Sequence, residues 1–325
     1  MEAKKGIKTS QLLNIILFIT LALVILFGYY YINKVNPIET ARETVAPVNP
    51  DAPPDYLFSI YGEGTNRIVQ PSNVYVADNR IFVSDRGRQK VVVFNYNGEY
   101  LFDIGANTLA EPHGVVMVNG ELYVADVGTR LIHVFDSNGQ FLRYFAEKKP
   151  YKPLDIKYRD GKFYVTDAVR QLVYVYDETG KELMSIGGRN NENIKQEGKF
   201  YYIWGVALDS KGDIYLSDPN LNRIQVFDSQ GKFIKVLASK LENNEGGFSI
   251  PRGIYIDKND NLFAASMLGN RIDVMKPDGT RKFGFSQTAP NDKPLQGPGA
   301  VFVDNNNRIF VADQLNSRIA VYKAK

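Results

Sequence analysis

Acidic residues recur at regular intervals through the chain and are its first candidates for chemistry. Each ends a short apolar run of the form I/L-Y/F-V-A/S-D, and five of six copies keep the acid. The positions are Asp85, Asp126, Asp167, Asp218, Ser266 and Asp313, separated by 41, 41, 51, 48 and 47 residues. A ring of carboxylates could bind a metal ion or supply an acid and a base for catalysis.

A structural role explains these acids better. An Asp at the end of a strand can accept hydrogen bonds from loop amides and can pair across the turn with a base. Basic residues follow five positions later in four copies, at Lys90, Arg223, Arg271 and Arg318. In copies two and three Leu131 and Leu172 take that position, with Arg130 and Arg170 nearby. We therefore interpret the repeated acids and bases as structural and assign no catalytic residue.

Histidine and cysteine are scarce, which limits the possible enzymes. The chain has two histidines, His113 and His133, and no cysteine. The absence of cysteine excludes disulfides, thiolate metal ligands and Cys nucleophiles. There is also no G-x-S-x-G elbow, P-loop or dinucleotide fingerprint. The sequence predicts no cofactor and no metal.

Six copies of a longer pattern position the acids. The pattern is roughly P-x-G-V-x-V, a turn, the apolar run with its acid, five variable residues and a V-x-V-F run, and the copies begin at Pro71, Pro112, Pro153, Ile203, Pro251 and Pro298. Each copy holds four β-rich runs separated by turn signals such as Asn97-Gly98. Runs that are apolar at successive positions, such as 81–83, are typical of sheets covered on both faces. This period with four strands predicts an all-β, six-bladed β-propeller.

The last copy ends without a fourth strand. It stops at residues 321–325, whereas residues 56–60 have a sequence like that of the fourth strand of the first copy, residues 100–104. We expect strand 56–61 to pair beside the last copy and close the ring, because closure leaves no exposed sheet edge. The propeller is then residues 56–325.

The first 55 residues predict a membrane anchor and a tether. Residues 12–32 carry no charge and could form about 31 Å of helix, which spans a bilayer. Three lysines precede this stretch, so the positive-inside rule places residues 1–11 in the cytoplasm. Residues 33–55 are Pro-rich and predict a linker. We expect a single-pass cell-membrane protein with an extracytoplasmic propeller; the alternative, a cleaved signal peptide, lacks a small-x-small site.

The repeats resemble the NHL-repeat family of six-bladed propellers. Val311-Ala312-Asp313 followed by Arg318 matches the blade motif of that family, and the resemblance covers roughly residues 55–325. Copies two and three depart from the motif, and copy five has Ser266 in place of Asp.

The resemblance suggests three activities, none of which fits the chain well. Some family members are zinc-dependent lyases with several converging histidines, and two histidines are too few. Related lactonases hold calcium at central oxygens, for which only Asn73 and Asp155 occupy comparable positions. Other members bind RNA, but a net charge of +3 and the outward topology argue against a nucleic-acid partner.

Propeller geometry predicts the face on which a ligand binds. The linkers between blades and the loops between second and third strands share one face, which we call the linker face. The residues expected on this face or beside the channel are His113, Trp204, Arg252, Arg86, Arg130, Arg170, Asp155 and Tyr202. Arginine beside aromatic rings suits a protein, a peptide or a cell-envelope polymer. Trp204 could instead plug the channel, and the arginines could simply be solvated.

The sequence therefore predicts a binding or scaffold module. The alternative is a hydrolase or lyase that uses Asp155, His113 and Arg252 at the central channel. Convergence of these three side chains on one pocket would favour the enzyme.

Overall fold

The computed structural model describes residues 17–25, 28, 51–146, 150–190, 196–237, 247–290 and 292–325. Residues 17–25 and 28 are helical, and residues 51–325 form a separate compact unit. In the part of the chain that is described, no helix has both the length and the apolar character needed to cross a membrane. The rest of the expected anchor 12–32, all of residues 1–11 and residues 33–50 of the expected linker lie outside the described residues.

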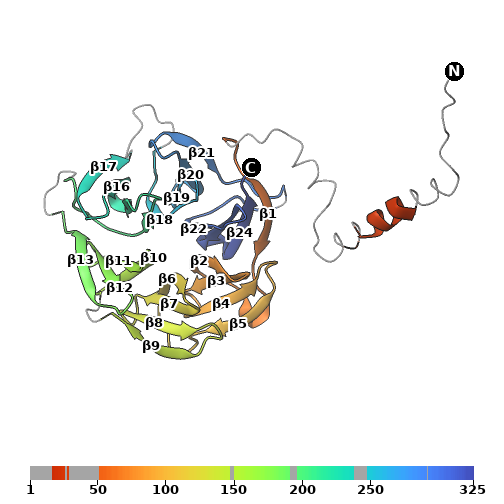
Figure 1. Cartoon of the computed structure of the whole chain (residues 1–325), viewed down its shortest axis with the longest axis horizontal. Helices are drawn as coiled ribbons and strands as arrows, with labels where there is room; N and C mark the ends of the chain where they lie inside the picture. Colours follow the sequence, from red (N-terminus) through yellow and green to blue (C-terminus); the bar gives the residue numbers. More distant parts are fainter. Residues whose placement is uncertain are drawn as a thin grey trace, which may run out of the picture. The chain divides into compact units, whose positions relative to one another are not determined.

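Six antiparallel four-stranded sheets are arranged around one axis as the blades of a propeller (Figure 1). The inner strands are β2 (Pro71–Ala77), β6 (Pro112–Val118), β10 (Pro153–Arg159), β14 (Val206–Leu208), β18 (Pro251–Ile256) and β22 (Pro298–Val303). The second strands are β3 (Arg80–Asp85), β7 (Glu121–Asp126), β11 (Lys162–Asp167), β15 (Ile214–Asp218), β19 (Leu262–Ser266) and β23 (Arg308–Asp313). The predicted six-bladed all-β fold is confirmed.

The third and outer strands complete each blade. The third strands are β4 (Lys90–Asn95), β8 (Leu131–Asp136), β12 (Leu172–Asp177), β16 (Arg223–Phe227), β20 (Arg271–Met275) and β24 (Arg318–Lys323). The outer strands are β5 (Tyr100–Ile104), β9 (Phe141–Phe145), β13 (Glu182–Gly187), β17 (Phe233–Leu237), β21 (Arg281–Phe285) and β1 (Asp55–Ile60). Three short 3-10 turns lie in loops, namely η1 (Gly64–Asn66), η2 (Pro219–Leu221) and η3 (Gln314–Asn316).

The core lies between neighbouring blades rather than inside one layer. Ile81, Phe82 and Val83 are consecutive in β3 and all fully buried, because both faces of the sheet are covered. One cluster joins the first and last blades through residues such as Val83 and Phe310. Successive side chains of one strand point to opposite faces of the sheet, so they stabilise the interfaces with the two neighbouring blades.

The ring is closed by the earliest strand. β1 pairs antiparallel with β24, with Tyr56 opposite Tyr322 and Ile60 opposite Ile319. The two strands, near opposite ends of the propeller sequence, lie side by side in Figure 1. The last blade thus has the order β1-β24-β23-β22 and no uncovered third strand.

The repeated Asp ties each linker to its blade. Asp85 accepts hydrogen bonds from the backbone N–H groups of Val69, Gln70, Gly87 and Arg88 at 2.8 to 3.2 Å. Asp126 and Asp167 each make the equivalent four contacts. These carboxylates hold the interblade linker against the turn after the second strand.

One expected pairing is wrong. Lys90 does not pair with Asp85, and its ammonium instead lies 2.6 Å from the carboxylate of Asp103 on β5. The oxygens of Asp85 are already occupied by four amides. In contrast, Arg223 donates to Asp218 at 3.4 Å.

The fifth blade has a serine at the repeated acid position and a buried carboxylate on the next strand. Ser266 stands where the other blades have Asp, and its hydroxyl lies 2.5 Å from Asp273. Asp273 in turn accepts a hydrogen bond from Arg271 at 2.7 Å and is paired with Arg281 at 3.3 Å. The buried carboxylate has moved to the neighbouring strand and keeps its arginine partner.

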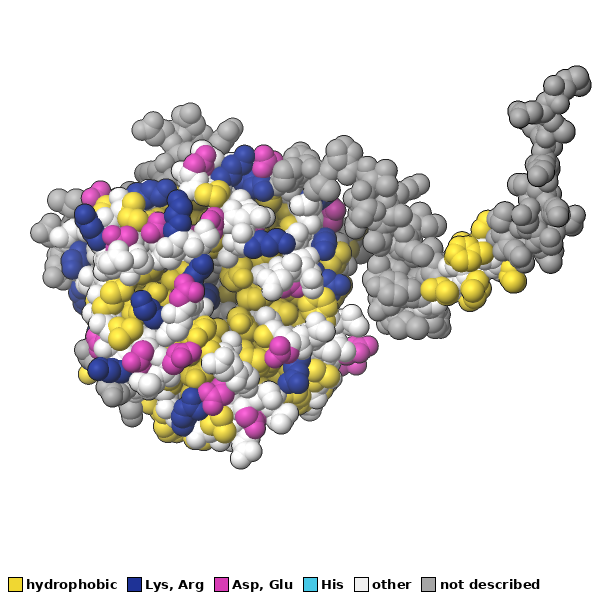
Figure 2. Space-filling model, in the orientation of Figure 1, with side chains coloured by type: hydrophobic (Ala, Val, Ile, Leu, Met, Phe, Trp, Pro, Cys, Tyr) yellow, Lys and Arg dark blue, Asp and Glu magenta, His cyan; other side chains and the backbone are white. Residues whose placement is uncertain are grey.

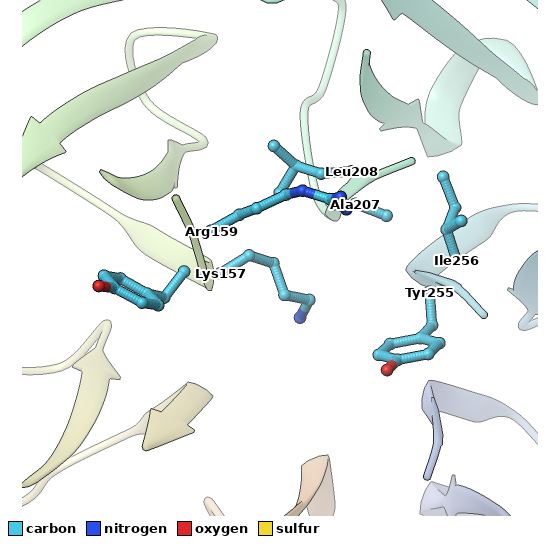
Figure 3. Close-up of a pocket in the computed structure, with 7 residues that line it drawn as sticks. Lys157, Arg159, Ala207, Leu208, Tyr255 and Ile256 are labelled. Atoms are coloured by element: carbon cyan, nitrogen blue, oxygen red, sulfur yellow. The ribbon is translucent and has the colours of Figure 1, made fainter. Parts of the chain in front are cut away.

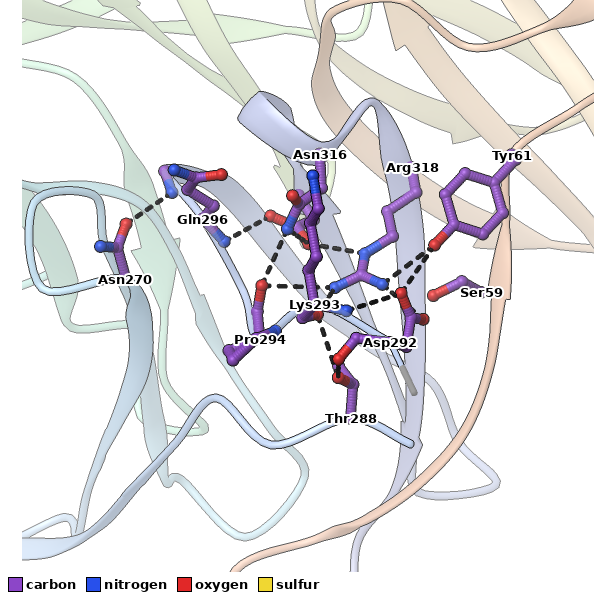
Figure 4. A network of polar contacts seen from close by, with 12 residues as sticks. Ser59, Tyr61, Asn270, Thr288, Asp292, Lys293, Pro294, Gln296, Asn316 and Arg318 are labelled. Carbon is purple, nitrogen blue, oxygen red and sulfur yellow. Dashed lines mark hydrogen bonds and ion pairs between the residues drawn. The ribbon is translucent and has the colours of Figure 1, made fainter. Parts of the chain in front are cut away.

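A buried polar network holds the closing strand (Figure 4). The Arg318 guanidinium is fully buried and lies 2.7 Å from Asp313 and 2.5 Å from Asp292. Asp292 also accepts hydrogen bonds from Tyr61 at 3.0 Å and from Tyr56 at 3.1 Å. Arg318 therefore connects the last blade to the first residues of the propeller.

Removal of β1 is expected to destabilise the whole propeller. A chain that begins at Asp51 should fold, whereas one that begins at Tyr61 should lose about 3 kcal/mol or more of unfolding free energy, because it loses buried groups such as Ile60 and exposes β24. Urea unfolding and size-exclusion chromatography of both chains measure this. Equal stability and a monomeric short chain would contradict closure by β1.

Arg318→Met should cost about 3 kcal/mol of unfolding free energy, because it leaves two carboxylates without their buried cation. The matched control is Arg271→Met at the same blade position. Its side chain is 29% exposed and Arg281 remains beside Asp273, so the expected loss is about 1 kcal/mol or less. The comparison is made by urea unfolding. A loss for Arg318→Met no larger than the control's argues against this network.

Candidate functional site at the linker face

The inner strands converge so closely that small residues are required at their third repeat position. That position holds Asn73, Gly114, Asp155, Gly205, Gly253 and Ala300. A Cβ added to Gly114 would lie 2.6 Å from the backbone of Ile156, and one added to Gly253 would lie 2.7 Å from Ala300. The channel consequently has a narrow waist at this level.

Asp155 lies in this waist and not on the linker face. It is 2% exposed, and its oxygens accept hydrogen bonds from Lys157 at 2.8 Å, from the Ile156 amide at 3.0 Å and from the Val206 amide at 3.2 Å. The Asn73 side chain lies 3.5 Å away. Among the described residues, no group of three or more His, Asp or Glu could hold a metal ion.

Trp204 is the centre of the contacts at the linker face. The Arg252 guanidinium lies 4.4 Å above its ring, in the range of a cation–π interaction. The ring centroids of His113 and Tyr202 lie 6.0 and 5.9 Å from that of Trp204. The structure therefore brings together four of the predicted residues from three blades. We call these four residues the Trp204 cluster.

Glu111 is a member of this site that the sequence did not reveal. Its carboxylate lies 3.5 Å from His113 and 3.8 Å from Arg86, so the rim is not purely cationic. The hydrogen bond with His113 lowers the pKa of Glu111, which stays ionised at neutral pH. The sequence feature that could have identified Glu111 is its position just before an inner strand.

Burial lowers the pKa of both basic groups in the Trp204 cluster. It lowers the pKa of His113 despite the nearby Glu111, so the imidazole is neutral at neutral pH. Burial, with Arg86 nearby, also lowers the pKa of Arg252. Arg252 donates to Gln314 at 3.2 Å, while its Nε is buried without a partner among the described residues. The rest of the Arg252 side chain is half-buried and lies beside Trp204.

Two predicted arginines lie apart from the Trp204 cluster. Arg170 stacks over Tyr151 at 4.2 Å and donates to the Tyr174 hydroxyl at 2.8 Å. Arg130 is exposed and has a left-handed backbone with φ of 61°. Neither contacts Trp204 in the described structure.

Exposed apolar side chains occupy equivalent positions in the loops of the same face. Val69, Tyr151 and Tyr201 each stand two residues before a repeat start, and Val169, Leu268 and Leu315 each stand two residues after the repeated acid position. Leu268, Tyr201 and Leu315 are 63%, 60% and 59% exposed. Repeated exposure of large apolar groups on one face is typical of an interaction surface.

Charge is mixed over the propeller surface. In the view of Figure 2, Lys and Arg side chains are interspersed with Asp and Glu, and hydrophobic groups lie between them. On the side of the propeller that Figure 2 shows, basic side chains do not form a continuous surface. An electrostatic footprint for nucleic acid would need one.

Solved structures of several functions share this fold. A virginiamycin B lyase from Staphylococcus aureus matches with a TM-score of 0.55 and 16% identity over 80% of this chain and 86% of its own. A gluconolactonase from Xanthomonas campestris matches with a TM-score of 0.62 and 17% identity over 86% of this chain and 99% of its own. A protein of unknown function from Bacteroides thetaiotaomicron matches with a TM-score of 0.62 and 13% identity over 79% of this chain and 70% of its own. At these identities the likeness shows the fold alone.

Family models match parts of the chain directly. A model described as a 6-bladed beta-propeller matches residues 63–108, and the NHL repeat matches residues 109–135 and 200–227. No curated protein matches significantly. With six blades closed by β1 and these matches, the chain is a six-bladed β-propeller that carries NHL repeats at residues 109–135 and 200–227.

Proposed function

We propose that this propeller is a binding module that captures a protein or peptide segment on its linker face. The observation that carries the proposal is the Trp204 cluster at the channel mouth together with large exposed apolar residues in the surrounding loops. Binding hot spots are enriched in Trp, Tyr and Arg, and a rim of apolar side chains excludes water around them.

The polar groups of the site suit a peptide backbone. Arg252 presents a half-buried guanidinium, and Glu111 offers a partly exposed carboxylate. A peptide presents both carbonyl acceptors and amide donors, so it can satisfy both groups while its side chains contact Tyr201 or Leu315. A cell-envelope polymer is the competing ligand. The crosslinking experiment below distinguishes the two, because the captured molecule is then a polymer and not a protein.

A hydrolase or lyase is the second candidate, and its proposed residues argue against it. The oxygens of Asp155 are occupied by Lys157 and two backbone amides. His113 and Arg252, in contrast, both contact Trp204 at the linker mouth. A general acid or base must reach the substrate, and the contacts of Asp155 direct it to the waist.

A membrane tether completes the proposal. The uncharged residues 12–32 and the lysines before them support a single-pass anchor with the propeller outside the cytoplasm. Such an anchor would hold the linker face and its captured partner near the membrane.

Site-specific photo-crosslinking in intact cells tests the binding face. A photoreactive residue at Leu268 or Tyr201 should capture a defined protein, and one at Leu183 on outer strand β13 should not. Adding Trp204→Ala with Arg252→Ala should reduce capture about tenfold or more, because both anchors are lost. Tyr144→Ala, also on an outer strand, is the control. Equal capture from Leu183, or capture unchanged by the double substitution, would reject this face.

Cell fractionation tests the tether. The full chain should remain with the membrane pellet after alkaline carbonate extraction. This treatment releases proteins that are held to the membrane by charge, but it does not extract a helix that spans the bilayer. A chain that begins at Asp51 should move to the soluble fraction. Release of the full chain by carbonate would refute the anchor without affecting the linker-face proposal.

A further inference from the structure

Two adjoining cavities open at the channel mouth opposite the linker face. Their volumes are about 380 and 180 Å³, and they share Lys157, Tyr158 and Tyr255. The fifth position of all six repeats contributes to their lining, with Tyr75, Val116, Lys157, Ala207, Tyr255 and Phe302. Small-molecule sites start at about 300 Å³, so the larger cavity could hold one or two ring-sized units.

Three aromatic rings form one wall of the larger cavity. The Phe302 centroid lies 5.0 Å from that of Tyr75 and 4.9 Å from that of Tyr255. The three residues come from the inner strands of three blades, so their positions are set by the propeller itself. Burial raises the pKa of Tyr75 and of Tyr255, so both hydroxyls stay neutral.

The cavity also contains donors aimed into its open space. Lys157 and Tyr255 extend into the same space in Figure 3. The Tyr255 hydroxyl has no hydrogen-bond partner among the described residues. The Lys157 ammonium has three N–H donors. One contacts Asp155, and two remain for a ligand.

The rim is rich in amide and carboxylate side chains. Asp78, Asn79, Asn305 and Asn306 line it from the loops that follow two inner strands. Asn305 and Asn306 are exposed. Asn side chains both donate and accept hydrogen bonds, as each hydroxyl group of a ligand requires.

The lining contains charges of both signs, with Lys157 and Arg159 opposed by Asp78 and Asp304, and Arg159 is also paired with Asp160 at 3.3 Å. This balance disfavours strongly charged ligands. A cation would meet the Lys157 ammonium, which lies within the cavity. An anion would gain little, because Asp155 lies 2.8 Å from that ammonium and offsets its charge. Aromatic walls, amides at the rim and a neutral floor together favour an uncharged ring that carries several hydroxyls.

We propose that this cavity binds a neutral sugar ring, as a monosaccharide or as the end of a longer glycan. The apolar face of the ring packs on Tyr75, Tyr255 and Phe302, and its hydroxyls bond to Lys157, the Tyr255 hydroxyl and Asn305. The site is separate from the Trp204 cluster, so it stands or falls independently of the proposed function.

Titration calorimetry of the chain from Asp51, with N-acetylglucosamine, glucose and cellobiose as probes, tests the proposal. At least one neutral probe should bind, and glucuronate and choline should bind at least tenfold more weakly. Lys157→Met should weaken binding about tenfold, and Tyr255→Phe and Asn305→Ala several-fold, because each removes a hydrogen-bonding group. Asn305 is exposed, so that variant should keep its fold.

Two controls separate this site from the rest of the molecule. Lys232→Met removes an exposed lysine outside the cavity and should leave sugar affinity unchanged. Trp204→Ala should also leave it unchanged, while it reduces partner capture at the linker face. Absence of binding by all neutral probes at millimolar concentration would overturn the proposal. Tighter binding of choline or glucuronate, or equal affinity in folded Lys157→Met, Tyr255→Phe and Asn305→Ala, would overturn it as well.

Discussion

The convergence of six inner strands on one axis constrains every other feature of this molecule. At the third repeat position the backbones are so close that a Cβ on Gly114, Gly205 or Gly253 would lie within 2.7 Å of the next strand. Larger polar side chains are tolerated there only where they meet each other, as Asn73 and Asp155 do. The waist is therefore densely packed, and its polar groups bond to one another. Space for a ligand remains at the two mouths of the channel. Each mouth combines side chains from several blades, which no single repeat could provide.

The repeated carboxylates serve the same architecture. A blade contacts its neighbours through side chains, but the linker that joins two blades needs partners for its own amides, because unpaired buried amides are costly. Asp85 satisfies four such groups. In the fifth blade Ser266 replaces Asp, and the linker amides of Ser249 and Ile250 are accepted by the Ser266 hydroxyl at 3.4 Å and by the Asn222 side chain at 2.7 Å. A catalytic acid could not be replaced by neutral oxygens in this way, whereas a structural acceptor can be.

Repetition made the fold predictable, and lack of repetition hid the sites. Period, strand pattern and the truncated last copy all follow from spacing, so six blades could be inferred from the sequence. The contact of Trp204 with His113 and Arg252 was within reach because all three follow a repeat start. Asp155 was expected on the linker face or beside the channel, and it lies in the waist because its oxygens are bonded to Lys157 and to the amides of Ile156 and Val206. The aromatic wall could not be recognised, because Tyr75 and Phe302 have the sequence features of ordinary strand residues until the blades are placed around one axis.

The two mouths are connected through one residue, yet they are expected to act independently. Asp155 contacts Lys157 on the side of the cavity and the Val206 amide on β14, close to Trp204 in the chain. Proximity alone does not transmit a signal, because coupling requires an element with two alternative arrangements that both ligands bias. The waist offers the opposite, with backbones in close contact and a carboxylate whose oxygens are filled. A ligand at one mouth therefore has little that it can move at the other, so the two proposed ligands are expected to bind independently.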